Sequence, residues 1–136
     1  MTIKEKRIYL GQYQRIQNRI FGLTNELEKW KAIGEKVNNA MGIGGGSKQA
    51  NNSKVEKSAV NTMEILKAIQ AEVDEAEENR QRIIDTINNA PKLRHREILN
   101  MHFVNGMSVE KIARRLKKEE KTVSNAITNA LRELNI

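Results

Sequence analysis

The sequence predicts an all-α protein in which a long antiparallel coiled-coil hairpin precedes a tri-helical helix-turn-helix module. Two runs of apolar residues recur every 3.5 residues, as in a coiled-coil seam. A glycine-rich stretch separates these runs, and short amphipathic segments follow the single proline, Pro91. Since proline is the strongest helix breaker, its absence before position 91 favours long helices there. We therefore predict two domains, a hairpin at residues 1–90 and a module at residues 91–136.

The first predicted helix covers residues 3–40. An apolar or aromatic side chain recurs there at alternating steps of four and three, interrupted by Gly34, at Tyr9, Tyr13, Ile16, Ile20, Leu23, Leu27, Trp30, Val37 and Met41. Gly11, Gly22 and Gly34 each weaken a helix by about 1 kcal/mol relative to alanine. This helix is therefore expected to need a partner and to fray locally at its glycines.

The second predicted helix supplies that partner. The same spacing continues through Val55, Ala59, Thr62, Leu66, Ile69, Val73, Ala76, Arg80, Ile83 and Ile87. We expect an antiparallel pair whose seam includes Ile16, Ile20, Leu23, Leu27, Leu66, Ile69 and Val73. The intervening segment, about residues 41–54, is predicted to be a flexible turn because its glycines have high backbone entropy and no face to bury. A phosphate-binding loop would need a preceding strand and a following Lys-Ser or Lys-Thr, and this segment has neither.

Charge is distributed unevenly along the chain, whose formal net charge is +7. Residues 1–40 carry +4, residues 41–90 carry −2 and residues 91–136 carry +5. The acidic cluster consists of Glu72, Asp74, Glu75, Glu77 and Glu78. Its carboxylates point in several directions around a helix, so we interpret it as a solvated face that pairs with the basic first helix. The basic excess favours phosphate-rich or acidic partners.

Several classes of protein are disfavoured. The chain has no cysteine, so disulfides and thiolate metal sites are excluded, and no apolar run reaches the length of a membrane span. The N-terminus lacks the apolar core of a signal peptide, which favours a cytoplasmic protein. His95 and His102 lie two helical turns apart, and no set of carboxylates is spaced to complete a metal site with them. No serine has the histidine and carboxylate of a nucleophile site. We expect neither enzymatic activity nor a metal or cofactor.

The module after Pro91 is predicted to hold three short helices. The first ends near Gly106, the second is VEKIARRL with Ser108 as its cap, and the third is KTVSNAITNALREL. Their apolar faces are expected to form the core with Ile98, Leu99, Met101, Phe103, Ile112, Ala113, Leu116, Val123, Ala126, Ile127, Ala130, Leu131 and Leu134. The small Ala113 suits the close helix crossing of a helix-turn-helix.

These residues resemble the fourth conserved region of bacterial sigma factors. In register with its pattern are Ile98-Leu99, Met101, Phe103, Gly106, Ser108, Ile112-Ala113, Leu116, Thr122-Val123, Ala130-Leu131 and Leu134. Lys111 replaces a usual glutamate, Lys117 a frequent turn glycine, and Glu119 the usual Ser or Thr cap. In layout the chain is similar to small phage and prophage transcription regulators that join a coiled coil to such a module. The resemblance implies double-stranded DNA as partner, contact with bacterial RNA polymerase, and a place at the host nucleoid.

Helix geometry and the resemblance together nominate DNA-binding side chains. The positions of Glu120, Lys121, Ser124 and Asn125 are those that meet base edges in the family, and Asn125 can contact adenine through two hydrogen bonds. Arg114, Arg115, Lys117 and Lys118 flank the turn and would neutralise phosphates. The full predicted set is Ser108, Arg114, Arg115, Lys117, Lys118, Glu120, Lys121, Thr122, Ser124, Asn125 and Thr128.

Alternatives from other functional classes stay open. A small terminase subunit for phage DNA packaging also combines a helix-turn-helix with a coiled coil, but it generally carries the DNA-binding module first. A protein-interaction adaptor that has lost DNA binding is the other alternative, because Glu119 and Glu120 place negative charge where DNA would approach. The hairpin also offers a surface for homodimerisation, which would match an inverted repeat in the DNA.

Overall fold

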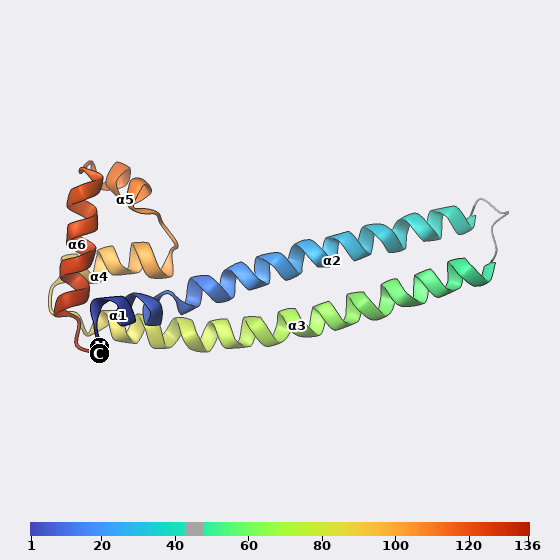
Figure 1. Ribbon diagram of the computed structural model, residues 1–136, viewed down its shortest axis with the longest axis horizontal. Coiled ribbons are helices and arrows are strands. Elements are labelled where there is room, and N and C mark those ends of the chain that lie inside the picture. The colour runs from blue at the N-terminus through green and yellow to red at the C-terminus, as the bar shows by residue number, and fades with distance from the viewer. Residues whose placement is uncertain (43–47) are drawn as a thin grey trace. The chain divides into compact units, whose positions relative to one another are not determined.

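The computed structural model confirms the all-α class, and the residues that it describes contain helices and no strand (Figure 1). It describes the backbone of residues 1–42 and 48–136 and the side chains of residues 1–36 and 53–136. The elements in chain order are α1 (Ile3–Leu10), α2 (Gln12–Gly42), α3 (Lys48–Asn88), α4 (Leu93–Leu99), the π-helix η1 (Asn100–Val104), α5 (Val109–Leu116) and α6 (Glu120–Glu133). None of the described helices is both long and apolar enough to cross a membrane.

The chain forms two compact units. Residues 1–17 and 75–136 make up the first, here called the helix-turn-helix unit, and residues 18–74 make up the second, here called the helix-pair unit. The domain boundary predicted at 90/91 stays a prediction. The compact units divide elsewhere because Leu10 of α1 and Ile83 and Ile87 of α3 are buried in one core with the last three helices.

The predicted helix at residues 3–40 is two helices, and they meet at Gly11. Thr2 caps α1, and its hydroxyl accepts a hydrogen bond from the Glu5 backbone N–H at 3.1 Å. A Cβ atom built on Gly11 would lie 2.9 Å from the Arg7 carbonyl oxygen, so a larger residue would crowd this junction. The single helix predicted at residues 3–40 was therefore wrong. The break falls at Gly11, whereas Gly22 and Gly34, the other two glycines expected to weaken the helix, lie within α2. The Lys6 and Leu10 side chains of α1 are buried.

In the helix-pair unit, α2 and α3 run antiparallel and side by side (Figure 1). The Ser58 hydroxyl donates to the Trp30 carbonyl at 2.9 Å. Near the other end of the unit, Arg19 pairs with Glu72 at 3.0 Å, so one member of the acidic cluster does pair with the basic first helix. Ile16 and Leu27 of the predicted seam are buried, and Ile20, Leu23, Ile69 and Val73 are half-buried.

Leu66 does not belong to the seam. Its side chain is 47% exposed, whereas the neighbouring Ile65 is only 8% exposed. Ala59 and Arg80 are exposed too, while Ser58 and Asn79 one residue earlier are buried. Ser58, Ile65 and Asn79 are themselves spaced by multiples of seven, so a heptad repeat is present at these positions. It lies one residue before the predicted one, which is about 100° around the helix axis.

The turn predicted at about residues 41–54 overlaps helix at both ends, because α2 continues to Gly42 and α3 begins at Lys48. The remainder of this prediction, at residues 43–47, lies outside the described residues.

The core of the helix-turn-helix unit is built from the predicted faces of the last helices. Ile98, Leu99, Ile112, Ile127 and Leu131 are among its buried side chains. The first turns of α2 are also tied to it. The Gln14 side-chain amide donates to the Val104 carbonyl at 2.8 Å, beside Gly106, whose φ of +70° suits glycine. Leu116 departs from the prediction because it is 40% exposed at the end of α5.

Candidate nucleic-acid interface

The second helix of the predicted three-helix module is α5, and it begins at a side-chain cap. The Ser108 hydroxyl accepts a hydrogen bond from the Lys111 backbone N–H at 3.2 Å, which satisfies one of the free donors at the helix start. Ile112 and Ala113 are buried, whereas Arg114 and Arg115 of the last turn are exposed. The buried alanine lets α5 lie close to α6, and the two arginines present their charges to solvent.

The turn between α5 and α6 is closed by a left-handed residue. Lys117 has φ 55° and ψ 48°, and it holds the position where the family pattern often has glycine. The Lys118 N–H donates to the Ala113 carbonyl at 2.9 Å, which is the six-residue hydrogen bond of a Schellman C-cap. The turn therefore has the expected geometry although a lysine occupies the glycine position.

The third helix, α6, buries one side and exposes the other. Val123, Ile127 and Leu131 are buried against the unit's core. Glu119 stands at the N-cap in extended conformation, but its side chain makes no capping hydrogen bond. The exposed side chains of α6 are Glu120, Lys121, Thr122, Ser124, Asn125, Asn129, Arg132 and Glu133.

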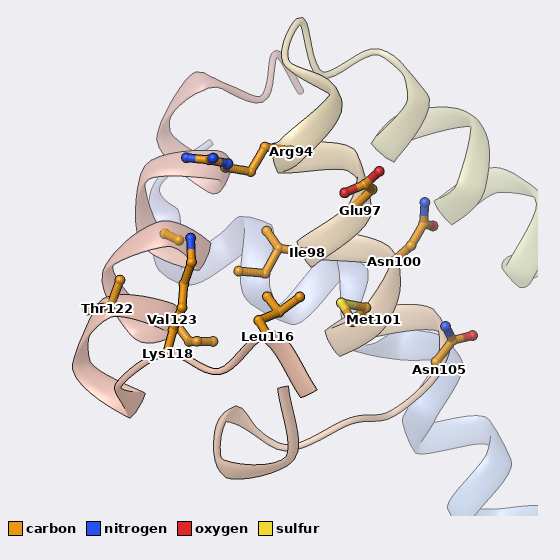
Figure 2. A pocket seen from close by; sticks show the side chains of 11 residues that line it. Arg94, Glu97, Ile98, Asn100, Met101, Asn105, Leu116, Lys118, Thr122 and Val123 are labelled. Atoms are coloured by element: carbon orange, nitrogen blue, oxygen red, sulfur yellow. The ribbon is translucent and has the colours of Figure 1, made fainter. Parts of the chain in front are cut away.

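A hollow of about 520 Å³ opens on one flank of α6. Figure 2 shows Ile98 and Met101 from α4 and η1 pointing toward Leu116, Lys118 and Val123 from α5, the turn and α6. Arg94 and Lys118 add positive charge at the rim, and Glu97, Asn100, Asn105, Thr122 and Ala126 complete the lining. The exposed half of Leu116 is therefore part of this surface.

The order of these elements, a capped α5, a left-handed turn and an α6 with one free face, is that of a helix-turn-helix. Residues 93–134 match the family model for Sigma-70, region 4. This match confirms the resemblance drawn from the residues and identifies the segment as a region-four-like, DNA-binding type of module. No curated protein and no solved structure matches the chain significantly.

The structure leaves ten of the eleven nominated side chains exposed, on α5, on α6 and on the turn between them. The exposed ones on α5 and the turn are Ser108, Arg114, Arg115, Lys117 and Lys118, and those on α6 are Glu120, Lys121, Thr122, Ser124 and Asn125. Lys118 and Thr122 also line the hollow. Thr128 differs because it is half-buried and its hydroxyl accepts a hydrogen bond from Arg7 at 3.0 Å. DNA contact by each of these residues stays a prediction.

Sequence reasoning missed the N-terminal residues beside α6. Lys6 and Arg7 of α1 both bond to this helix, although they precede it by more than a hundred residues. The basic cluster of Lys4, Lys6 and Arg7 was the available signal, but its charge was assigned to pairing within the hairpin.

The two histidines occupy different surroundings. His102 Nδ1 lies 2.8 Å from the Met107 carbonyl oxygen. His95 is buried, with Nδ1 3.1 Å from a carboxylate oxygen of Glu133. Within the described parts of the chain, no three His, Asp or Glu side chains gather closely enough to hold a metal ion.

Proposed function

We propose that the chain is a sequence-specific, double-stranded-DNA-binding transcription regulator that acts through α6 in the major groove. The observation that carries this proposal is the region-four-like match over a helix-turn-helix whose third helix has a free polar face. A helix fits the major groove of B-DNA, where each base pair presents a distinct pattern of donors and acceptors. The proposed role requires no catalytic group.

The exposed residues of α6 and those at the end of α5 would have different roles on DNA. Lys121, Ser124 and Asn125 project from the free face of α6 and can donate hydrogen bonds to base edges. Arg114 and Arg115, exposed at the end of α5, would contact backbone phosphates, which fix the position of a module without reading its sequence.

Binding to DNA tests the proposal. A preferred duplex is first selected from a random library, and its affinity is then compared with that of a scrambled duplex at several salt concentrations. Asn125→Ala and Lys121→Ala should relax the preference at individual base pairs, with about 1–3 kcal/mol at stake for a contact made through two hydrogen bonds. Arg114→Ala and Arg115→Ala should weaken both duplexes alike and flatten the salt dependence by about one unit of slope per lost phosphate contact.

Substitution of Glu120 distinguishes two possible roles of the acidic residues at the start of α6. If the carboxylate accepts a hydrogen bond from a cytosine amine, Glu120→Ala loses selectivity. If it only repels phosphates, the same change raises the affinity for every duplex. A chain that binds no duplex at low salt, even with Glu119 and Glu120 both neutralised, would contradict the regulator and favour the adaptor.

The adaptor is the second candidate because a specific observation favours it. The hollow on the flank of α6 has an apolar floor, with Ile98, Met101 and Val123, and a cationic rim, with Arg94 and Lys118. Such a surface suits an acidic, amphipathic segment of another protein. Contact with bacterial RNA polymerase, an origin in a phage or prophage, and a site of action at the nucleoid belong to the regulator proposal through the resemblance. The terminase alternative remains disfavoured by the position of the module after the long helices.

A further inference from the structure

The N-terminal helix α1 is fastened to the C-terminal end of α6 by a buried lysine. Lys6 is only 7% exposed, and its ammonium donates to the Leu131 carbonyl at 2.9 Å and to the Leu134 carbonyl at 2.6 Å. Carbonyls at the end of a helix lack partners within it and carry partial negative charge. The ammonium therefore caps α6 from a part of the chain more than 120 residues away.

Arg7, the next residue, lies against the side of α6. Its Nη2 donates to the Thr128 hydroxyl at 3.0 Å, and that hydroxyl in turn donates to the Ser124 carbonyl at 3.1 Å. Thr128 follows Ser124 by one turn, so the guanidinium lies next to the free face of α6 that we propose to read bases.

The Arg7 side chain keeps donors for a further anion. A guanidinium has five N–H donors, and the bond to Thr128 uses Nη2 alone among the described residues. The side chain is half-buried, so it is held in place and still reaches solvent. Lys4, three residues earlier on the same side of α1, is exposed and adds a second positive charge.

We propose that α1 is part of the DNA-binding surface and that Arg7 contacts a backbone phosphate beside α6. The inference rests on the proposed function, because it adds a contact to the same DNA complex. A phosphate is the expected ligand because Arg7 approaches α6 on its third turn, at the flank of the free face, while bases meet the first turns. Arginine recognises phosphate through parallel N–H donors in a planar fork.

The test compares full-length chains on a selected and a scrambled duplex over a range of salt concentrations. Arg7→Gln removes the charge but keeps an amide donor for Thr128, and Arg7→Lys keeps the charge without the fork. Lys67→Ala, in the helix-pair unit, is the matched control for the loss of one positive charge. Arg7→Gln should weaken both duplexes alike, by roughly five- to tenfold at low salt, and lower the salt slope by about 0.9. Arg7→Lys should retain the slope, and Lys67→Ala should change neither quantity.

Different failures have different meanings. If the wild-type chain binds no duplex at low salt, the proposed function fails, and this inference fails with it. If the wild-type chain binds and a folded Arg7→Gln variant keeps its affinity and slope, only the inference about α1 is wrong. A loss confined to the selected duplex would also overturn it, because that pattern indicates contact with a base. Melting curves identify the folded variants, and Thr128→Val, which removes only the anchoring hydroxyl, gives a second route to displace Arg7.

Discussion

Two lysines at helix ends are in unfavourable local states. Lys117 has an unfavourable backbone conformation, and Lys6 has a buried charge. Lys117 adopts a left-handed backbone that costs a residue with a Cβ roughly 1–2 kcal/mol. Lys6 is buried, which is tolerable because its ammonium donates to two carbonyls at the end of α6. Each residue contributes to the helix-turn-helix unit despite this local cost. The backbone of Lys117 forms the turn after α5, and the charge of Lys6 caps the end of α6.

At the residue scale, the first prediction concerns Lys117→Gly. Relief of the left-handed strain is partly offset by about 0.4–1 kcal/mol of added freedom in the unfolded chain. We expect the free energy of unfolding to rise by up to about 1 kcal/mol, measured by urea denaturation. DNA affinity should fall in the same variant because a positive charge beside the turn is lost.

Lys118→Gly is the matched control, since Lys118 has no positive φ and the change adds only unfolded-state freedom. We expect it to destabilise the chain. An equal loss of stability in both variants would show that the left-handed backbone at Lys117 carries no strain.

At the scale of the elements, the contact between α2 and α3 depends on Ser58, Gly34 and Ile65. The spacing of apolar residues in the sequence did not identify their part in it. Ser58 bonds to Trp30, and a Cβ on Gly34 would lie 2.9 Å from the Ser58 hydroxyl oxygen. Small side chains on both helices therefore allow close approach at this point. Ile65, rather than Leu66, supplies the apolar burial of the next turns.

The second prediction follows from this register. Ile65→Ala should lower the free energy of unfolding by about 2–4 kcal/mol, because it removes a buried side chain and leaves a cavity. Leu66→Ala, its immediate neighbour, should change it by less than about 1 kcal/mol, because much of that side chain is already in water. Urea denaturation followed by helical circular dichroism measures both. A larger loss in Leu66→Ala would restore the register predicted from the sequence.

At the scale of the whole molecule, the helix-pair unit leaves several large apolar side chains in water. Phe21 is 69% exposed, Met63 60% and Val60 53%. A pair of helices buries only one stripe of each, which leaves little core to stabilise such a unit alone. Together with Leu66, these side chains are available to contact a second copy of the chain.

The third prediction is that the protein forms a homodimer through this unit. Light scattering at micromolar concentration should give twice the mass of one chain, and the selected DNA site should be an inverted repeat. Met63→Glu should shift the mass toward one chain, since a charge would be buried in the contact. Glu26→Lys, which changes the charge at an exposed position of α2 about 140° around the axis from Phe21, is the control and should leave the mass unchanged. A strict monomer on a site without symmetry would contradict the dimer.

Much of the module at residues 91–136 could be predicted because the sequence patterns that indicate its helices are local. Ser108 at a helix start, the apolar stripe of Val123, Ile127 and Leu131, and the polar break between α5 and α6 each involve residues within a few turns of one another. Local spacing determines which face of a helix is apolar, so the elements and most of the core followed from it. Leu116 differs because its burial depends on how α4 and η1 pack nearby.

The sequence alone thus determined the helical class, the region-four-like module and the chemistry of its free face. Only the tertiary structure decided that Gly11 separates two helices, that Ile65 replaces Leu66 in the seam, and that Lys6 and Arg7 hold α6. The physical reason is range. Helix periodicity and capping act over a few residues, whereas the bonds from α1 to α6 join groups more than 120 positions apart. No local pattern records which distant carbonyl or hydroxyl a surface lysine or arginine will meet after folding.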